Sequence, residues 1–320
     1  MSKIRAAVIG VGYLGRFHAQ KYAQLPVCDL VAVVDEREEV RNAVAAEVRT
    51  TAMADYRTLL GKVDAVSVAT PTPAHFEIAD AFLAAGAHVL VEKPISETPE
   101  QARALIEQAA RHKRVLQVGH LERFNAAILA AEPHLSTPRF MECQRLAPYK
   151  ERGTDVNVVL DLMIHDIDLV QSLARSEIVS IDAIGSPVFS GEIDIANARI
   201  RFANGCVAST TASRVSLKTE RKLRIFEDAA YISLDLQQKI LTLIRKREGP
   251  PQTGQLPVTI EEANLEQGDA LKAEIESFLE CIRNDRRPIV SGEDGLRALE
   301  TAIRITEQVH ANLAATRKPA

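Results

Sequence analysis

The 320-residue sequence has no tryptophan, few aromatic residues and no excess of basic residues. Its 39 Lys and Arg face 43 Asp and Glu, which gives a formal net charge of −4 at pH 7. Nucleic acids and anionic membranes favour a basic protein face, so the composition argues against both partners. The one locally basic stretch, 214–224, is interrupted by Glu220 and has no aromatic side chain on which a base could stack.

Cysteine pairs, a secretion signal and long apolar runs are also missing. The four cysteines lack the paired spacing of zinc sites, and we expect them to be free thiols in a reducing cytosol: Cys28, Cys143, Cys206 and Cys281. The N-terminus has no long apolar region followed by a small-residue cleavage site. No run reaches the roughly 18 apolar residues of a membrane span. These absences predict a cytoplasmic protein.

Short apolar runs alternate with helical patterns over the first 120 residues. The runs cover residues 4–9, 30–34, 65–69, 88–91 and 115–118. Continuous apolar runs of this length are typical of parallel strands that are covered on both faces. Two helical patterns separate the later runs, at 74–85 and from a capped start at Thr98-Pro99 to about 112. Such repeated units predict an α/β fold whose first domain, residues 1–121, is a doubly wound Rossmann sheet.

The pattern changes to antiparallel signals beyond residue 121. Apolar and polar residues alternate over 196–202, and Asn204-Gly205 forms a hairpin turn into 206–213. A further alternating strand is expected at 232–237, and 249–257 is expected to be a surface loop. Helical patterns follow at 271–282 and from a capping box at 291–294. We therefore predict a second domain, 122–320, with an open and mostly antiparallel sheet, whose last helix (about 291–314) is free to pack back on the first domain.

A dinucleotide-binding turn follows the first strand. The order Gly10-Val11-Gly12-Tyr13-Leu14-Gly15 supplies a tight turn, a close approach for a pyrophosphate and tight helix packing, at a helix N-terminus that favours phosphate. Asp35 closes the second strand and is placed to accept the ribose hydroxyls of NAD while repelling the extra phosphate of NADP. Arg37 is a complication, because an arginine can pair with that phosphate. We expect NAD rather than NADP.

Two further segments lie at the carboxyl edge of the predicted sheet, where ligands bind in such folds. Thr70-Pro71 leads to His75, which either caps the next helix or contacts the cofactor. The run 88–91 ends in Glu92-Lys93-Pro94, so Lys93 lies at the mouth of a buried strand. Glu92 and Lys93, like Thr70 and Pro71, are therefore candidate cofactor contacts. Lys93 is a candidate to stabilise negative charge on a reacting oxygen, and a surface lysine paired with Glu92 is the alternative.

A helical segment around 158–173 contains Asp161 and His165, four residues apart and so expected on one face. An imidazole with an ordinary pKa of about 6.5 suits a proton acceptor near neutral pH. Asp161 would orient it or form a hydrogen bond with the substrate, so both residues are also candidate substrate contacts. A purely structural pair and a metal site that includes Asp166 and Asp168 are the alternatives. We expect no metal, because hydride transfer does not need one.

Together these motifs resemble the Gfo/Idh/MocA family of sugar and inositol oxidoreductases over essentially the whole chain. The resemblance rests on the glycine turn, Thr70-Pro71 with His75, Glu92-Lys93-Pro94, and Asp161-x-x-x-His165 with Asp168. It implies a Rossmann domain, a C-terminal domain with a large open sheet, and an active site in the cleft between them. It also implies that Lys93, Asp161 and His165 are catalytic, and that the Lys93–Pro94 bond is often cis in the family.

A narrower likeness is to family members that oxidise UDP-N-acetylglucosamine at the sugar 3-hydroxyl for lipid A or surface-sugar synthesis. The stretches that carry it are His120-x-Glu122-Arg123-Phe124-Asn125, Arg145-x-x-Pro148, Thr154-Asp155-Val156 and Arg221-Lys222-x-Arg224. The likeness implies a substrate site that includes His120 and Asn125, and a diphosphate would be bound by Arg123, Arg145 and Arg152. Charges at sheet edges and in loops are the alternative for these arginines.

The sequence thus predicts an NAD-dependent oxidoreductase of a sugar-ring secondary alcohol. One alternative is a relative that acts on a free sugar, inositol or an anhydro-sugar. Another is a regulator that senses dinucleotide without turnover, although the presence of Lys93, Asp161 and His165 together argues against it. The family's habit of packing its sheets face to face further implies a homodimer or homotetramer.

Overall fold

The computed structural model describes residues 2–150, 156–247, 249, 256–266 and 268–316. The chain forms two compact units, of which the first comprises Met1–Leu121 with Asp269–Leu299 and the second Glu122–Gly268 with Glu300–Ala320. The boundary at residue 121 coincides with the one expected from the sequence. The expected second domain, 122–320, differs from the structure because residues 269–299 belong to the first unit.

The first unit is built on a six-stranded parallel sheet with the order β3-β2-β1-β4-β5-β6. The strands are β1 (Ile4–Ile9), β2 (Cys28–Val34), β3 (Thr51–Met53), β4 (Ala65–Val68), β5 (His88–Glu92) and β6 (Leu116–Gly119). Every residue of β4 and β6 is buried, as expected for strands covered on both faces. The structure therefore confirms the doubly wound prediction and adds β3, a short and partly exposed edge strand.

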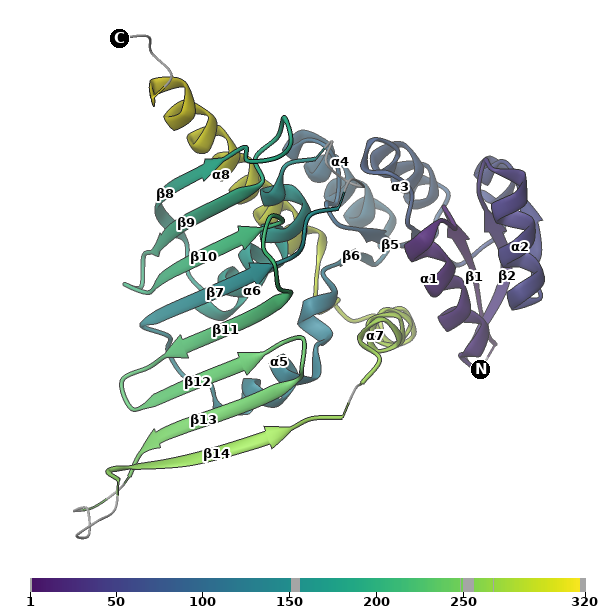
Figure 1. Ribbon diagram of the computed structural model, residues 1–320. Helices are drawn as coiled ribbons and strands as arrows, with labels where there is room; N and C mark the ends of the chain where they lie inside the picture. Colours follow the sequence, from purple (N-terminus) through teal and green to yellow (C-terminus); the bar gives the residue numbers. More distant parts are fainter. Residues whose placement is uncertain (1, 151–155, 248, 250–255, 267, 317–320) are drawn as a thin grey trace. The chain divides into compact units, whose positions relative to one another are not determined.

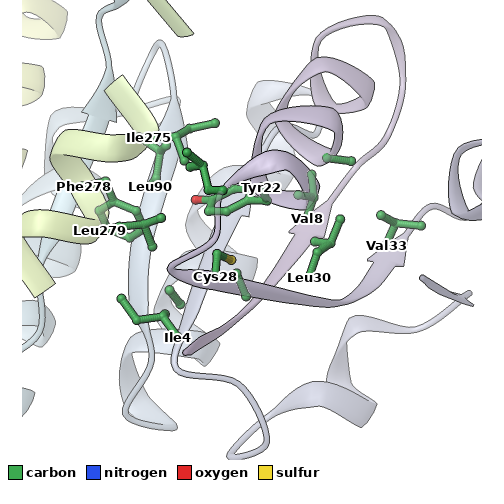
Figure 2. Close-up of a cluster of buried hydrophobic side chains, with 14 of the residues drawn as sticks. Ile4, Val8, Tyr22, Cys28, Leu30, Val33, Leu90, Ile275, Phe278 and Leu279 are labelled. Atoms are coloured by element: carbon green, nitrogen blue, oxygen red, sulfur yellow. The ribbon is translucent and has the colours of Figure 1, made fainter. Parts of the chain in front are cut away.

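Helices flank this sheet and close its core. They are α1 (Tyr13–Gln24), α2 (Glu38–Val48), α3 (His75–Ala84), α4 (Pro99–His112) and α7 (Ala270–Asn284), with the short helices η1 (Tyr56–Leu59) and η2 (Thr72–Ala74). Figure 2 shows Ile275, Phe278 and Leu279 of α7 on one side of Tyr22, with Val8 and Leu30 on the other. Because α7 buries its apolar stripe in this core, the segment belongs to the first unit.

The second unit is built on an eight-stranded sheet with the order β14-β13-β12-β11-β7-β10-β9-β8 (Figure 1). The strands are β7 (Phe140–Leu146), β8 (Ile178–Ser186), β9 (Ile195–Phe202), β10 (Val207–Ser213), β11 (Glu220–Phe226), β12 (Ala230–Asp235), β13 (Ile240–Lys246) and β14 (Val258–Asn264). Only the β7–β10 pair is parallel among these strands. The predicted open and mostly antiparallel sheet is confirmed.

Helices cover one face of the large sheet. The helix α6 (Ile164–Ala174) contacts β7 and β10, and α5 (Ala126–Ala131) contacts β12 and β13 (Figure 1). The helix predicted at 158–173 begins with a π-helical turn, η5 (Val159–Met163), and continues as α6. Two short helices, η3 (Leu121–Phe124) and η4 (Glu132–His134), flank α5, and α8 (Gly292–Thr316) continues from the first unit into the second.

Three expectations from composition can be compared with the structure. All four cysteines are buried and free, as predicted. No helix in the described part of the chain is long and apolar enough to cross a membrane. Most of the expected loop at 249–257 lies outside the described residues.

Candidate active site

The glycine turn connects β1 to α1 in the first unit. Gly10 has a φ of +80°, a conformation that side chains rarely tolerate, and a Cβ on Gly15 would clash with the carbonyl oxygen of Gly10. Gly12 is the N-cap of α1 without a side-chain cap, and the first turn, which includes Tyr13 and Leu14, has no acidic residue. The N–H groups at this helix end and its dipole therefore fit a phosphate group.

Asp35 follows β2 and lies beside the turn. Its carboxylate accepts hydrogen bonds from the N–H of Val11 (3.1 Å) and from the N–H and Nε of Arg37 (3.0 and 3.1 Å). Burial alone would raise the pKa of Asp35, but these hydrogen bonds outweigh it and lower the pKa. Asp35 is thus an ionised acceptor beside the turn, and its contact with ribose hydroxyls stays a prediction. The turn and Asp35 together fit a nicotinamide dinucleotide, which would supply the hydride acceptor when bound.

His75 is the first residue of α3 and is buried. Its Nδ1 lies 2.8 Å from the carbonyl oxygen of Pro94, and its Nε2 lies 2.8 Å from that of Thr70. The sequence left open whether His75 caps a helix or contacts the cofactor. In the structure the ring connects the Thr70-Pro71 segment after β4 to the segment after β5, so it holds the two loops together.

Lys93 follows the last residue of β5 and is half-buried, and its peptide bond to Pro94 is cis. Glu92 is buried, and its carboxylate lies 3.0 Å from Nε2 of His18 and accepts the N–H of Lys93 at 3.3 Å. A Cβ on Gly119 would meet this carboxylate, so Glu92 is directed into the sheet, toward β6. The carboxylate of Glu92 is therefore bound within the interior of the domain, and a cofactor contact by Glu92 stays a prediction.

The four ionisable residues of the Asp161–Asp168 segment have two different environments in the second unit. Asp166 and Asp168 are buried, and each is ion-paired with an arginine. Asp161, on the π-helical turn, and His165, on α6, are half-buried. The fold therefore uses Asp166 and Asp168 for its own stability, and Asp161 and His165 stay the candidates for chemistry that the sequence indicated.

The arginines expected to bind a diphosphate have partners within the second unit. Arg145 is 3% exposed and donates to Asp166 (2.8 Å from Nη2) and to Glu122 (2.9 Å from Nη1). Arg123 makes a two-point contact with Asp168, at 2.6 and 2.9 Å. These contacts favour a structural role for both arginines and argue against the diphosphate contact. Arg152 lies outside the described residues.

The other two expected substrate contacts are also buried. Asn125 is the N-cap of α5, and its amide donates to Glu122 (3.0 Å) and to the carbonyl oxygen of Leu236 (2.9 Å). His120 is 1% exposed, at the end of the first unit's continuous segment. Asn125 thus organises the start of the second unit, and a substrate contact by either residue stays a prediction.

Sequence reasoning missed a buried network in the first unit. His18 of α1, Glu92 and Glu274 of α7 place one ligand-type atom each within 4.8 Å of the others. Glu274 occupies a position on the apolar stripe of its helix, beside Ile275 and three residues after Leu271. An acidic residue at an otherwise apolar helix position was the signal available in the sequence. Only the fold shows that Glu274 lies next to His18 and Glu92.

Comparisons with known proteins extend these observations. An oxidoreductase-family model described by its NAD-binding Rossmann fold matches residues 4–120, and the model of the same family's C-terminal α/β domain matches residues 143–312. The chain belongs to the Gfo/Idh/MocA oxidoreductase family. It is therefore a dehydrogenase with an NAD(P)-binding Rossmann domain.

Individual relatives cover almost the whole chain. The chain is 41% identical to a UDP-N-acetylglucosamine 3-dehydrogenase of Acidithiobacillus ferrooxidans, over 98% of this chain and 99% of the relative. A solved structure of such an enzyme from that organism has a TM-score of 0.92 and covers 97% of this chain and 99% of its own. An NAD⁺-dependent scyllo-inositol 2-dehydrogenase of Bacillus subtilis is 27% identical over 95% of this chain and 93% of its own length.

Proposed function

We propose that this protein is an NAD-dependent dehydrogenase that oxidises the 3-hydroxyl of UDP-N-acetylglucosamine. The observation that carries the proposal is the 41% identity to such an enzyme over 98% of the chain. The half-buried Lys93, Asp161 and His165 support it, because each of the three groups that the reaction requires is present. Surface-sugar or lipid A synthesis is the metabolic setting that follows from such a product.

Oxidation of a secondary alcohol requires removal of the hydroxyl proton and of a hydride. His165 accepts the proton, since a neutral imidazole suits a general base near neutral pH. The Lys93 ammonium stabilises the negative charge that develops on the oxygen. Asp161 orients His165 or accepts a hydrogen bond from the sugar. NAD supplies the hydride acceptor.

We further propose NAD as the preferred cofactor. The ionised Asp35 carboxylate suits two ribose hydroxyls and repels a 2′-phosphate. Arg37, whose side chain is 65% exposed, is held by that carboxylate through its Nε at 3.1 Å. It could bind a 2′-phosphate only by leaving Asp35. NADH and NADPH titrations of the same protein compare the two cofactors directly.

The test is NADH formation on mixing the protein and NAD with UDP-N-acetylglucosamine, free N-acetylglucosamine or myo-inositol. We expect the absorbance of NADH to increase only with UDP-N-acetylglucosamine. If only myo-inositol is oxidised, the protein is instead an inositol dehydrogenase. His165→Asn and Lys93→Ala should each lower kcat by about 10²-fold or more while NAD binding persists. Full activity of both variants would contradict the proposed roles.

The uridine diphosphate needs cationic or N–H donors. Because Arg123 and Arg145 are paired with buried carboxylates, Arg152 remains our candidate among the three arginines. Arg152→Gln should raise the KM for UDP-N-acetylglucosamine and leave NAD binding unchanged. We also propose that the protein is a homodimer or homotetramer that pairs through the large sheet, which native mass spectrometry would test.

A further inference from the structure

Three ionisable side chains meet inside the first unit, and one of them directly precedes Lys93 in the chain. They are His18, Glu92 and Glu274, and their closest ligand-type atoms lie within 4.8 Å of one another. His18 and Glu274 are 0% exposed, and Glu92 is 9% exposed. Burial of a charge is unfavourable unless it is paired, so the protonation state of this cluster must be well defined.

The contacts of His18 define a chain of donors that ends at Glu92. The Tyr22 hydroxyl lies 2.9 Å from Oγ of Ser67, and that Oγ lies 3.1 Å from Nδ1 of His18. Nε2 of His18 lies 3.0 Å from Oε1 of Glu92. When every hydrogen points toward Glu92, each donor in the chain has an acceptor. Glu92 is then the ionised end of the chain.

Glu274 has a different environment. Neither of its buried carboxyl oxygens has a hydrogen-bond partner among the described residues, and the buried Oε1 of Gln117 also lacks one. Gln117 donates its amide to the backbone carbonyl of Glu274 at 3.1 Å, which places β6 against α7 here. This region therefore holds several buried acceptors and too few donors. One proton on Glu274 supplies the donor that is missing.

The titratable groups that face Glu274 are Glu92 from β5 and Tyr22 and His18 from α1, and the neutral amide of Gln117 faces it from β6. Burial and the nearby Glu92 carboxylate both raise the pKa of Glu274 well above its usual value. A metal ion bound to Nε2 of His18 would require that nitrogen to be unprotonated, so His18 could no longer donate to Glu92 and the donor chain would be broken.

We propose that Glu274 is a protonated carboxylic acid at neutral pH, that it shares its proton with the Glu92 carboxylate, and that it thereby acts as a positioning residue for Lys93. The link to Lys93 is short: the same Glu92 carboxylate accepts the Lys93 N–H at 3.3 Å. A carboxylate held from two sides keeps the strand end in one conformation. The positioning part rests on the proposed function, whereas the protonation part does not.

Infrared spectroscopy tests the protonation directly. A protonated carboxylic acid has a carbonyl stretch well separated from carboxylate bands, and the wild type should show one at neutral pH. Glu274→Gln should remove this band, and Glu280→Gln, which changes an exposed residue of the same helix, should not. A band that survives in Glu274→Gln, or a stoichiometric metal ion in the purified protein, overturns the assignment.

The pH dependence of thermal unfolding is a second readout. The pKa of Glu274 is higher in the folded protein than in the unfolded chain, where it is about 4.3. The Glu274 side chain therefore contributes fully to the free energy of unfolding below that pH, and its contribution decreases as the pH rises. The Tm of Glu274→Gln relative to the wild type should therefore increase from about pH 5 to about pH 8. A constant difference over this range contradicts a protonated Glu274.

Turnover tests the positioning role. Glu274→Gln retains a donor toward Glu92 and should keep kcat within a factor of about two, whereas Glu274→Leu should lower kcat about tenfold at an unchanged Kd for NAD. Wild-type kcat in Glu274→Leu overturns the role. If Glu274→Leu does not fold, Glu274→Gln decides, because it should retain more of its neutral-pH kcat at about pH 9 than the wild type does. Absence of turnover in every protein, with the infrared result intact, contradicts the proposed function alone.

Discussion

Replacement of Arg145 by methionine should destabilise the second unit severely. The Arg145 side chain is 4% exposed, and its guanidinium is the partner of Asp166 (4% exposed) and of Glu122 (9% exposed). Methionine fills much of the same volume but leaves the buried Asp166 without its ion-pair partner, and Glu122 with only the half-exposed Arg221 at 3.5 Å. Removal of one member of a buried ion pair costs about 3–5 kcal/mol. We therefore expect a loss of about 4 kcal/mol from a stability that is typically about 5–15 kcal/mol.

Urea unfolding followed by far-UV circular dichroism is the suitable assay, because the sequence has no tryptophan to report by fluorescence. Arg139→Met is the matched control, since Arg139 precedes the same strand and forms an exposed ion pair with Asp228. The urea unfolding midpoint of Arg139→Met should differ little from that of the wild type. A triple variant that adds Glu122→Gln and Asp166→Asn should regain part of the stability, because no unpaired charge is then buried.

The opposite result is equally specific. If Arg145 binds the substrate diphosphate, Arg145→Met should raise the KM for UDP-N-acetylglucosamine strongly. Its unfolding midpoint would then stay close to that of Arg139→Met. A loss below about 1 kcal/mol together with a raised KM would refute the structural role that we infer from its burial and its partners.

Three further predictions concern the first unit. Gly15→Ala should abolish NAD binding and destabilise the domain, because the new Cβ would clash with the Gly10 carbonyl oxygen; calorimetric titration and Tm measure both. Asp35→Ala should weaken NADH binding about tenfold and reduce the ratio of the NADPH Kd to the NADH Kd. If both dissociation constants are unchanged, Asp35 does not contact the ribose. Burial lowers the pKa of His88 to about 4, and its Nδ1 accepts the Val115 N–H, so neutral His88 is favoured. Stability should fall from about pH 6.5 to about pH 4, and His88→Gln should flatten this dependence in acid-unfolding curves.

Local patterns were sufficient for most of the first sheet. Five of its six strands coincide with short, mostly apolar runs, and the glycine turn is defined by residues that are close together in the sequence. The position of helix α7 was not predictable in this way, because an amphipathic stripe shows that a face is buried without showing which sheet buries it. The parallel pairing of β7 with β10 likewise joins segments that are about 60 residues apart and leaves no local signal.

The residues of the candidate site were likewise predictable only where their placement depends on neighbouring residues in the sequence. Lys93 and the glycine turn were predictable because each is placed by the strand or helix next to it. The arginines were not, because the neutralising partners of Arg145 and Arg123 are 21 to 45 residues away. A charge in a sequence does not show whether the fold has already neutralised it, and the number of free cations was therefore overestimated.

Among the described residues, the buried acids nearly all have a basic partner, and that regularity distinguishes structural groups from chemical ones. Those with a partner are Glu92 with His18, Glu122 and Asp166 with Arg145, Asp168 with Arg123, and Asp194 with Arg214. An acid that the fold has neutralised has little capacity left for a substrate, so Asp166 and Asp168 are poor candidates for chemistry. Glu274 is the buried acid for which the structure offers another acid as its charged neighbour, and a proton is the simplest species that can neutralise it.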